Sequence, residues 1–170
     1  MERYAVRVAL VTGANSGIGA ATARALFEKG LKVVGLDKRI DMIKAHELKD
    51  APGKLYPLQV DVSSEESILC AFKWIKENLG GVDVLINSAG VCGESLPTNE
   101  FTSIQQISPG LLKTEIFSTL QKHSTEALEN MRLPMMESED MADAVIYMLS
   151  QPPRVQVYDI ILRPTGDLFC

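Results

Sequence analysis

Residues 8–19 read VALVTGANSGIG, and the fold we expect follows from this stretch. A short apolar run, Val8 to Val11, leads directly into glycines at positions 13, 17 and 19, and an alanine-rich helical stretch then continues to Gly30. A strand that feeds a glycine turn and then a helix brings backbone N–H groups and the positive end of the helix to one point. That arrangement is typical of a pyrophosphate site.

Each glycine of the turn has a separate expected task. We assign Gly13 to the tight turn, Gly17 to close approach of the backbone to a ligand, and Gly19 to close packing of helix on strand. A nucleotide-hydrolase phosphate loop is excluded, because no Gly-Lys-Ser/Thr follows. Asp37 ends the second apolar run, near the distance from the glycines at which an acid meets the adenosine ribose.

The composition predicts one globular domain over residues 1–170. Hydrophobic residues make up 46% of the chain and charged residues 23%, and the net charge of −5 argues against a nucleic-acid or anionic-membrane partner. No apolar run is long enough for a membrane span, and the start, MERYAVRVAL, leaves no room for a signal peptide. Three scattered cysteines and two histidines lack metal-ligand spacing, so we expect free thiols, no metal and a cytosolic location.

Strand and helix patterns alternate through the first half of the chain. We expect strands over 6–12, 32–37, 55–61 and 82–87, with helices over 16–30, 41–50 and 63–79 between them. Ser63 and Glu66 are expected to form a capping box for the third helix, whose buried stripe is Ile68, Phe72, Ile75 and Leu79, with Trp74 partly exposed. This alternation predicts an α/β fold with a Rossmann-like, doubly wound parallel sheet.

The motifs themselves resemble those of the short-chain dehydrogenase/reductase family. TGANSGIG at 12–19 is similar to that family's cofactor turn, TGxxxGxG, and NSAG at 87–90 is similar to its NNAG turn, with Ser88 in the second position. The stretch FKWIKENLGGVDVLINSAG resembles an animal cytosolic subgroup of farnesol dehydrogenase-like enzymes and carbonyl reductases. The resemblance covers residues 5–95 without a gap and returns at 108–114 and in the ending YDIILRPTGD.

Together, the spacing and the resemblance imply a bound dinucleotide, NAD or alternatively NADP. The family places Asp61 and Val62 beside the adenine ring, although this pair serves equally well as a helix start. Thr114, in the Pro-Gly turn, matches the threonine that holds the nicotinamide carboxamide. The expected cofactor-binding residues are Gly13, Asn15, Ser16, Gly17, Ile18, Gly19, Asp37, Lys38, Arg39, Asp61, Val62, Asn87, Ala89, Gly90, Pro109, Gly110 and Thr114.

One block of the family pattern is missing from this chain. Between the NSAG turn and the Pro-Gly turn, family members carry a helix with a structural Asn, a strand with a Ser and a helix with Tyr-x-x-x-Lys. Here a polar loop over 91–103 and a short strand at 104–107 follow instead, and no tyrosine has a lysine four residues later. We therefore expect one strand and two helices fewer than the family, a deletion junction near 100–107, no catalytic residue and loss of the family-type dimer interface.

After the junction, the pattern predicts helices over 114–130 and 138–150 and a last strand over 155–162. Three hypotheses for function remain open. The chain is an NAD(P)-dependent alcohol/carbonyl oxidoreductase by family, catalytically deficient in this form. Alternatively, it is a non-enzymatic dinucleotide-binding or regulatory isoform, or a non-functional splice product that does not fold.

Overall fold

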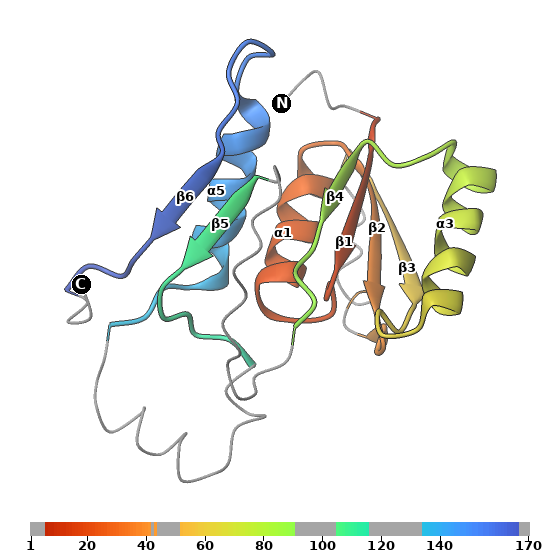
Figure 1. Ribbon diagram of the computed structural model, residues 1–170, viewed down its shortest axis with the longest axis horizontal. Helices are drawn as coiled ribbons and strands as arrows, with labels where there is room; N and C mark the ends of the chain where they lie inside the picture. The colour runs from red at the N-terminus through yellow and green to blue at the C-terminus, as the bar shows by residue number, and fades with distance from the viewer. Residues whose placement is uncertain (1–5, 42, 44–51, 91–104, 116–133, 167–170) are drawn as a thin grey trace, which may run out of the picture. The chain divides into compact units, whose positions relative to one another are not determined.

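The computed structural model describes residues 6–41, 43, 52–90, 105–115 and 134–166 (Figure 1). The chain divides after Gly90 into two compact units, and each is described by itself. The single domain over 1–170 stays a prediction. The expected loop at 91–103 lies outside the described residues, as do nearly all of the expected helices at 41–50 and 114–130.

The first unit contains a four-stranded parallel sheet. Its strands are β1 (Val8–Thr12), β2 (Lys32–Asp37), β3 (Lys54–Gln59) and β4 (Val84–Ile86), in the order β3-β2-β1-β4. Val8 pairs with Lys32 of β2, and Leu10 pairs with Leu85 of β4. The expected parallel α/β sheet is confirmed, with the fourth strand beside the first.

Two helices cover this sheet, α1 (Gly17–Glu28) and α3 (Glu65–Leu79). The α1 crossover runs from β1 to β2 and the α3 crossover runs back from β3 to β4, so right-handed connections place the two helices on opposite faces (Figure 1). All five residues of β1 are buried. A strand covered on both faces is expected to be continuously apolar, as Val8 to Val11 are.

Helix α3 differs from the expected helix in two details. Its N-cap is Ser64, whose hydroxyl accepts a hydrogen bond from the Ser67 N–H at 3.3 Å, so the predicted Ser63–Glu66 capping box is wrong. Ala71 and Ile75 form its buried line, whereas Phe72 is 40% exposed. The buried line is therefore rotated away from Phe72, and the half-buried Trp74 packs on the Tyr56 ring with centroids 5.9 Å apart.

The second unit pairs two parallel strands, β5 (Gln106–Pro109) and β6 (Asp159–Leu162), with helix α5 (Ser138–Ser150). The expected strand at 104–107 lies two residues later, and the last strand begins at Asp159 rather than at 155. Met141 and Ala142 of α5 are buried. A capping box between Glu137 and Asp140 begins this helix.

Candidate functional site

The glycine turn at residues 13–19 connects the end of β1 to the start of α1. Gly13 and Gly17 have φ angles of 69° and 55°, a left-handed region that other residues seldom adopt. A Cβ on Gly13 would lie 2.9 Å from the Cα of Ala89, and one on Gly19 would overlap the carbonyl oxygen of Gly13. These glycines let three backbone segments meet closely at the carboxyl edge of the sheet.

The N-terminal end of α1, which carries the positive end of the helix dipole, has no acidic side chain in its first turn. The N-cap residue Ser16 also makes no side-chain capping bond. By contrast, the first turn of α3 contains two glutamates and that of α5 contains Glu139 and Asp140. Since the first N–H groups of a helix lack partners within the helix, this end of α1 can receive an anion such as a pyrophosphate.

Asp37 lies at the end of β2, beside the glycine turn. Its Oδ2 accepts a hydrogen bond from the Asn15 N–H at 3.3 Å, and its Oδ1 accepts one from the Arg39 N–H at 3.0 Å. A carboxylate has about four lone-pair positions, so acceptor capacity remains after these two bonds. The backbone therefore orients Asp37 while leaving it able to accept further hydroxyl donors.

Thr12 joins a third segment to the same edge, although it is not among the site residues expected from the sequence. Its hydroxyl oxygen accepts hydrogen bonds from the N–H groups of Ser88 and Ala89, each at 3.0 Å. The side chain of Thr12 is almost fully buried. Its one sequence signal is a polar residue at the end of an otherwise apolar strand. Thr12 thus holds the 87–90 turn against Gly13.

Asp61 extends the edge beyond β3. Its Oδ1 accepts hydrogen bonds from the Ser63 hydroxyl at 2.6 Å and the Ser63 N–H at 2.9 Å, and its Oδ2 lies 3.1 Å from the Lys38 Nζ. These interactions, with those of Ser63 the larger, lower the pKa of Asp61 from 3.8 to about 2. Lys38 is therefore paired with Asp61, and Val62 beside it is 42% exposed.

The expected site residues that belong to the first unit, from Gly13 to Gly90 in the sequence, lie at or follow the carboxyl ends of its strands. The other three expected residues belong to the second unit. Pro109 ends β5, the N–H of Gly110 donates to the carbonyl oxygen of Leu162 at 2.7 Å, and Thr114 is half-buried. Their contribution to a cofactor site stays a prediction.

Three of the tyrosines lie among the described residues, and the absence of a catalytic Tyr–Lys pair stays a prediction. Tyr56 lies in β3, where the Lys54 Nζ is 5.2 Å from its ring centroid, and Tyr147 and Tyr158 are exposed. Within the described ranges, no group of three or more His, Cys, Asp or Glu side chains could hold a metal ion. None of the described helices has both the length and the apolar character needed to cross a bilayer.

The chain is similar to known proteins along nearly its whole length. It matches the short chain dehydrogenase family over residues 7–132. It is 34% identical to dehydrogenase/reductase SDR family member 11 of Gallus gallus over 254 residues, covering 99% of this chain and 100% of the relative. It is 29% identical to the farnesol dehydrogenase of Aedes aegypti over 252 residues, with coverage of 99% and 100%.

A solved structure shares the fold. The alcohol dehydrogenase of Thermococcus sibiricus, complexed with 5-hydroxy-NADP, superposes with a TM-score of 0.76 at 18% identity, over 95% of this chain and 98% of that one. The parallel sheet, the glycine turn that opens α1 and the extent of these matches agree with one another. The chain belongs to the short chain dehydrogenase family.

Proposed function

We propose that this chain binds a nicotinamide dinucleotide, with NAD(H) preferred over NADP(H), and that it is catalytically deficient as an alcohol/carbonyl oxidoreductase. The observation that carries the proposal is the Asp37 carboxylate, held by two backbone N–H groups beside the uncompensated positive end of α1. A pyrophosphate and an adenosine ribose need these two features side by side.

The preference for NAD(H) is argued from charge. The free acceptor positions of Asp37 suit the two hydroxyls of an adenosine ribose, whereas a 2′-phosphate would bring its negative charge against this carboxylate. Lys38 could offset that repulsion, but its Nζ pairs with Asp61 at 3.1 Å. The side chain of Arg39 follows directly and is the remaining cation in this run.

The catalytic deficiency is argued from the missing block. The alignment with the Gallus gallus relative runs over 254 positions and takes in all of that protein, although this chain has 170 residues. This supports an internal loss. Without the phenol that would protonate the alkoxide, general acid–base catalysis is lost, which lowers the rate by roughly 10²–10⁴-fold.

A titration of cofactor binding beside an activity assay tests both parts. We expect calorimetry to give NADH an affinity about tenfold or more above that of NADPH, which is about 1.4 kcal/mol. Asp37→Ser should weaken NADH and narrow this ratio, while Asp41→Asn, a charge loss at the next exposed acid, should not. Equal or tighter binding of NADPH by the unmodified chain would refute the preference.

The activity assay uses the full chain with either reduced cofactor and a panel of aldehydes and ketones, and with the oxidised cofactors and prenyl alcohols. Prenyl alcohols are included because one relative is named a farnesol dehydrogenase. We expect binding without steady turnover. Turnover near about 1 s⁻¹, the low end of ordinary enzyme rates, would contradict the deficiency. Absence of both binding and turnover would instead favour the non-functional splice product.

The non-enzymatic regulatory isoform predicts the same result, binding without turnover, so within this assay only measurable turnover would exclude it. The cytosolic location and the absence of a nucleic-acid partner stay predictions. So does the loss of the family-type dimer interface.

A further inference from the structure

Lys38, the residue after Asp37, is held through both its main chain and its side chain. Its carbonyl oxygen accepts a hydrogen bond from the Gln59 Nε2 at 2.9 Å, and Gln59 is the last residue of β3, paired in register with Asp37. The Nζ of Lys38 lies 3.1 Å from the Oδ2 of Asp61. Both contacts hold Lys38 against the carboxyl end of β3.

Asp61 is itself anchored by three hydrogen bonds. Its Oδ1 accepts from the Ser63 hydroxyl at 2.6 Å and the Ser63 N–H at 2.9 Å, and its own N–H donates to the Ser67 hydroxyl oxygen at 3.2 Å. The bonds from Ser63, more than the Lys38 ammonium, lower the pKa of Asp61 to about 2, so the carboxylate is charged at neutral pH. Because Asp61 is oriented in advance, less side-chain entropy is lost when Lys38 pairs with it.

The position of Lys38 in the chain gives this ion pair a consequence for the dinucleotide site. Lys38 directly follows Asp37, which is proposed above to accept the two hydroxyls of an adenosine ribose. A 2′-phosphate on that ribose would lie within reach of a lysine here, because its ammonium is a compact cation on a flexible four-carbon stem. A lysine paired with the phosphate would offset the repulsion by Asp37. While Lys38 pairs with Asp61, this offset is reduced.

We propose that Asp61 is a positioning residue that sets the choice between NAD(H) and NADP(H), by holding the Lys38 ammonium away from the position of a 2′-phosphate. This role rests on the proposed function, since it concerns the same dinucleotide site. The side chains of Lys38 and Asp61 are 64% and 42% exposed, so the effect is modest. We expect the pair to change the ratio of NADPH to NADH affinity by roughly three- to fivefold, the upper part of the range for surface ion pairs.

A double-mutant cycle on the full chain, with calorimetry for NADH and NADPH, tests this role. The measured quantity is the ratio of the two affinities, in which any contact of Asp61 with the adenine ring cancels, because both cofactors share this ring. Asp61→Asn should shift the ratio toward NADPH by about three- to fivefold. Lys38→Gln alone should change it by less than about twofold, because the pair already withholds this ammonium. With both substitutions, the ratio should stay within about twofold of that of Lys38→Gln alone.

A further variant keeps the charge of Asp61. Ser63→Ala removes the hydroxyl that orients the carboxylate, and it should shift the ratio in the same direction as Asp61→Asn but by less. This variant separates the orientation of the acid from its charge.

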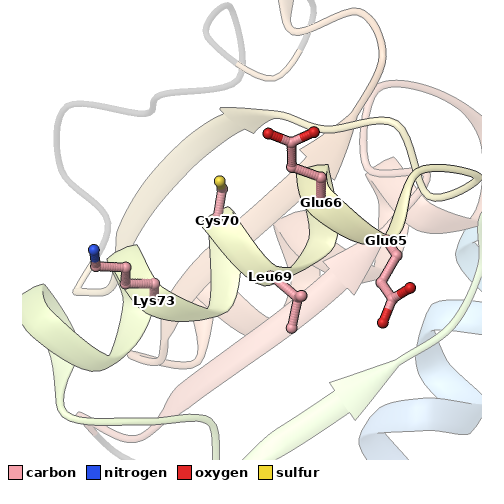
Figure 2. Close-up of a pocket in the computed structure, with 5 residues that line it drawn as sticks. All are labelled: Glu65, Glu66, Leu69, Cys70 and Lys73. Atoms are coloured by element: carbon pink, nitrogen blue, oxygen red, sulfur yellow. The ribbon is translucent and has the colours of Figure 1, made fainter.

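A matched control comes from the neighbouring acids of α3. They line a shallow hollow on the exposed face of that helix (Figure 2), with the lining residues Glu65, Glu66, Leu69, Cys70 and Lys73. Glu66→Gln removes one negative charge close in sequence to Asp61, whereas the ion pair found for Lys38 in the described part of the chain is with Asp61. Since charges exposed to solvent are screened, this control should leave the ratio within about 1.5-fold of the unmodified chain. Circular dichroism shows whether each variant is folded.

Two results would overturn the role of Asp61 alone. One is a ratio that Asp61→Asn leaves unchanged. The other is a shift toward NADPH that persists in the double variant, because Asp61 would then repel the 2′-phosphate directly rather than act through Lys38. Binding of neither cofactor by the unmodified chain would refute the proposed function and this role together. Tighter binding of NADPH by the unmodified chain would refute only the preference for NADH, since the shifts of the ratio would still decide the role of Asp61.

Discussion

The two units of the chain bury their strands very differently. In the first unit, β1 is buried along its whole length, and the largest fully buried side chains of the described residues, among them Phe27, Leu10 and Leu26, all belong to it. In the second unit, β6 alternates between exposed and half-buried residues, and Ile161 is 63% exposed. Parallel strands are normally covered on both faces, and only the first unit approaches this condition.

The same contrast holds for the site. At the carboxyl edge of the first unit, the side chains of Thr12, Asp37 and Asp61 accept hydrogen bonds from neighbouring loops. In the second unit, the Pro109–Gly110 turn is joined to the end of β6 by one backbone hydrogen bond from Gly110. The difference indicates that the first unit carries its own core, whereas the described part of the second unit lacks a comparable one.

The largest expected effect compares one apolar strand residue from each sheet, a buried one from the first and an exposed one from the second. Leu10→Ala removes a fully buried side chain between β2 and β4 and should lower the free energy of unfolding by about 2–5 kcal/mol. Ile161→Ala should change it by no more than about 0.5 kcal/mol, because this side chain is mostly exposed. Urea unfolding measures both, through the fluorescence of Trp74 for the first unit and circular dichroism for the whole chain. If both variants lost the same free energy of unfolding, the proposed difference in burial between the two sheets would be contradicted.

A smaller effect compares two glycines. An alanine at Gly13 would adopt a φ of 69° and bring its Cβ to 2.9 Å from the backbone of Ala89. We expect a loss of about 1–3 kcal/mol of stability and weaker NADH binding. At Gly110 the φ is ordinary, and the nearest atoms are the Cδ atoms of Pro164 at 3.0 Å and Arg163 at 3.1 Å, so the loss should stay below about 1 kcal/mol.

Thermal unfolding and calorimetry with NADH measure both variants. If Gly110→Ala destabilised the chain as much as Gly13→Ala, the close contact of Gly13 with the backbone of Ala89 would not explain the loss of stability.

Much of the first unit could be predicted from the sequence, because its signals are local and repeated. The apolar run of β1, the glycine spacing and Asp37 each stand directly in the chain, and they predict the parallel order that the structure has. Details that depend on neighbouring segments could not be predicted. Thr12 acquires its role only because the turn at 87–90 returns beside it.

Two errors on α3 have physical reasons. A capping box was expected at Ser63, but the Ser63 hydroxyl donates to Asp61, and the cap passes to Ser64. Phe72 was expected inside, but the packing of Trp74 on Tyr56 accompanies a helix rotation that leaves Phe72 at the border of the buried face. A periodicity of 3.6 residues predicts that the helix has a buried apolar face, and tertiary contacts decide which residues lie at the middle of that face. In the second unit, strand ends shifted by two to four residues because the local pattern there is short.

The smallest expected effect concerns the ion pairs of the two units. The Lys113–Glu137 pair of the second unit spans 3.6 Å between mostly exposed side chains, so Lys113→Gln should change stability by less than about 0.5 kcal/mol. Asp61 in the first unit combines an ion pair with two hydrogen bonds from Ser63, which lower its pKa to about 2. A lowered pKa in the folded state means that the carboxylate favours folding above about pH 4, and that this contribution is lost as the pH falls through about 2.

An NMR titration can show which interaction lowers the pKa of Asp61 most. The Asp61 carboxyl carbon is followed between about pH 6 and about pH 1.5, a range that includes both the ordinary pKa of an aspartate and the lowered one. Ser63→Ala should raise the pKa of Asp61 most, because the Ser63 hydroxyl is the largest of the lowering interactions, and Lys38→Gln should raise it less. If Lys38→Gln has the larger effect, the ion pair rather than the hydrogen bond controls this acid. Lys38 would then be more tightly engaged with Asp61, and less able to offset the repulsion between Asp37 and a 2′-phosphate.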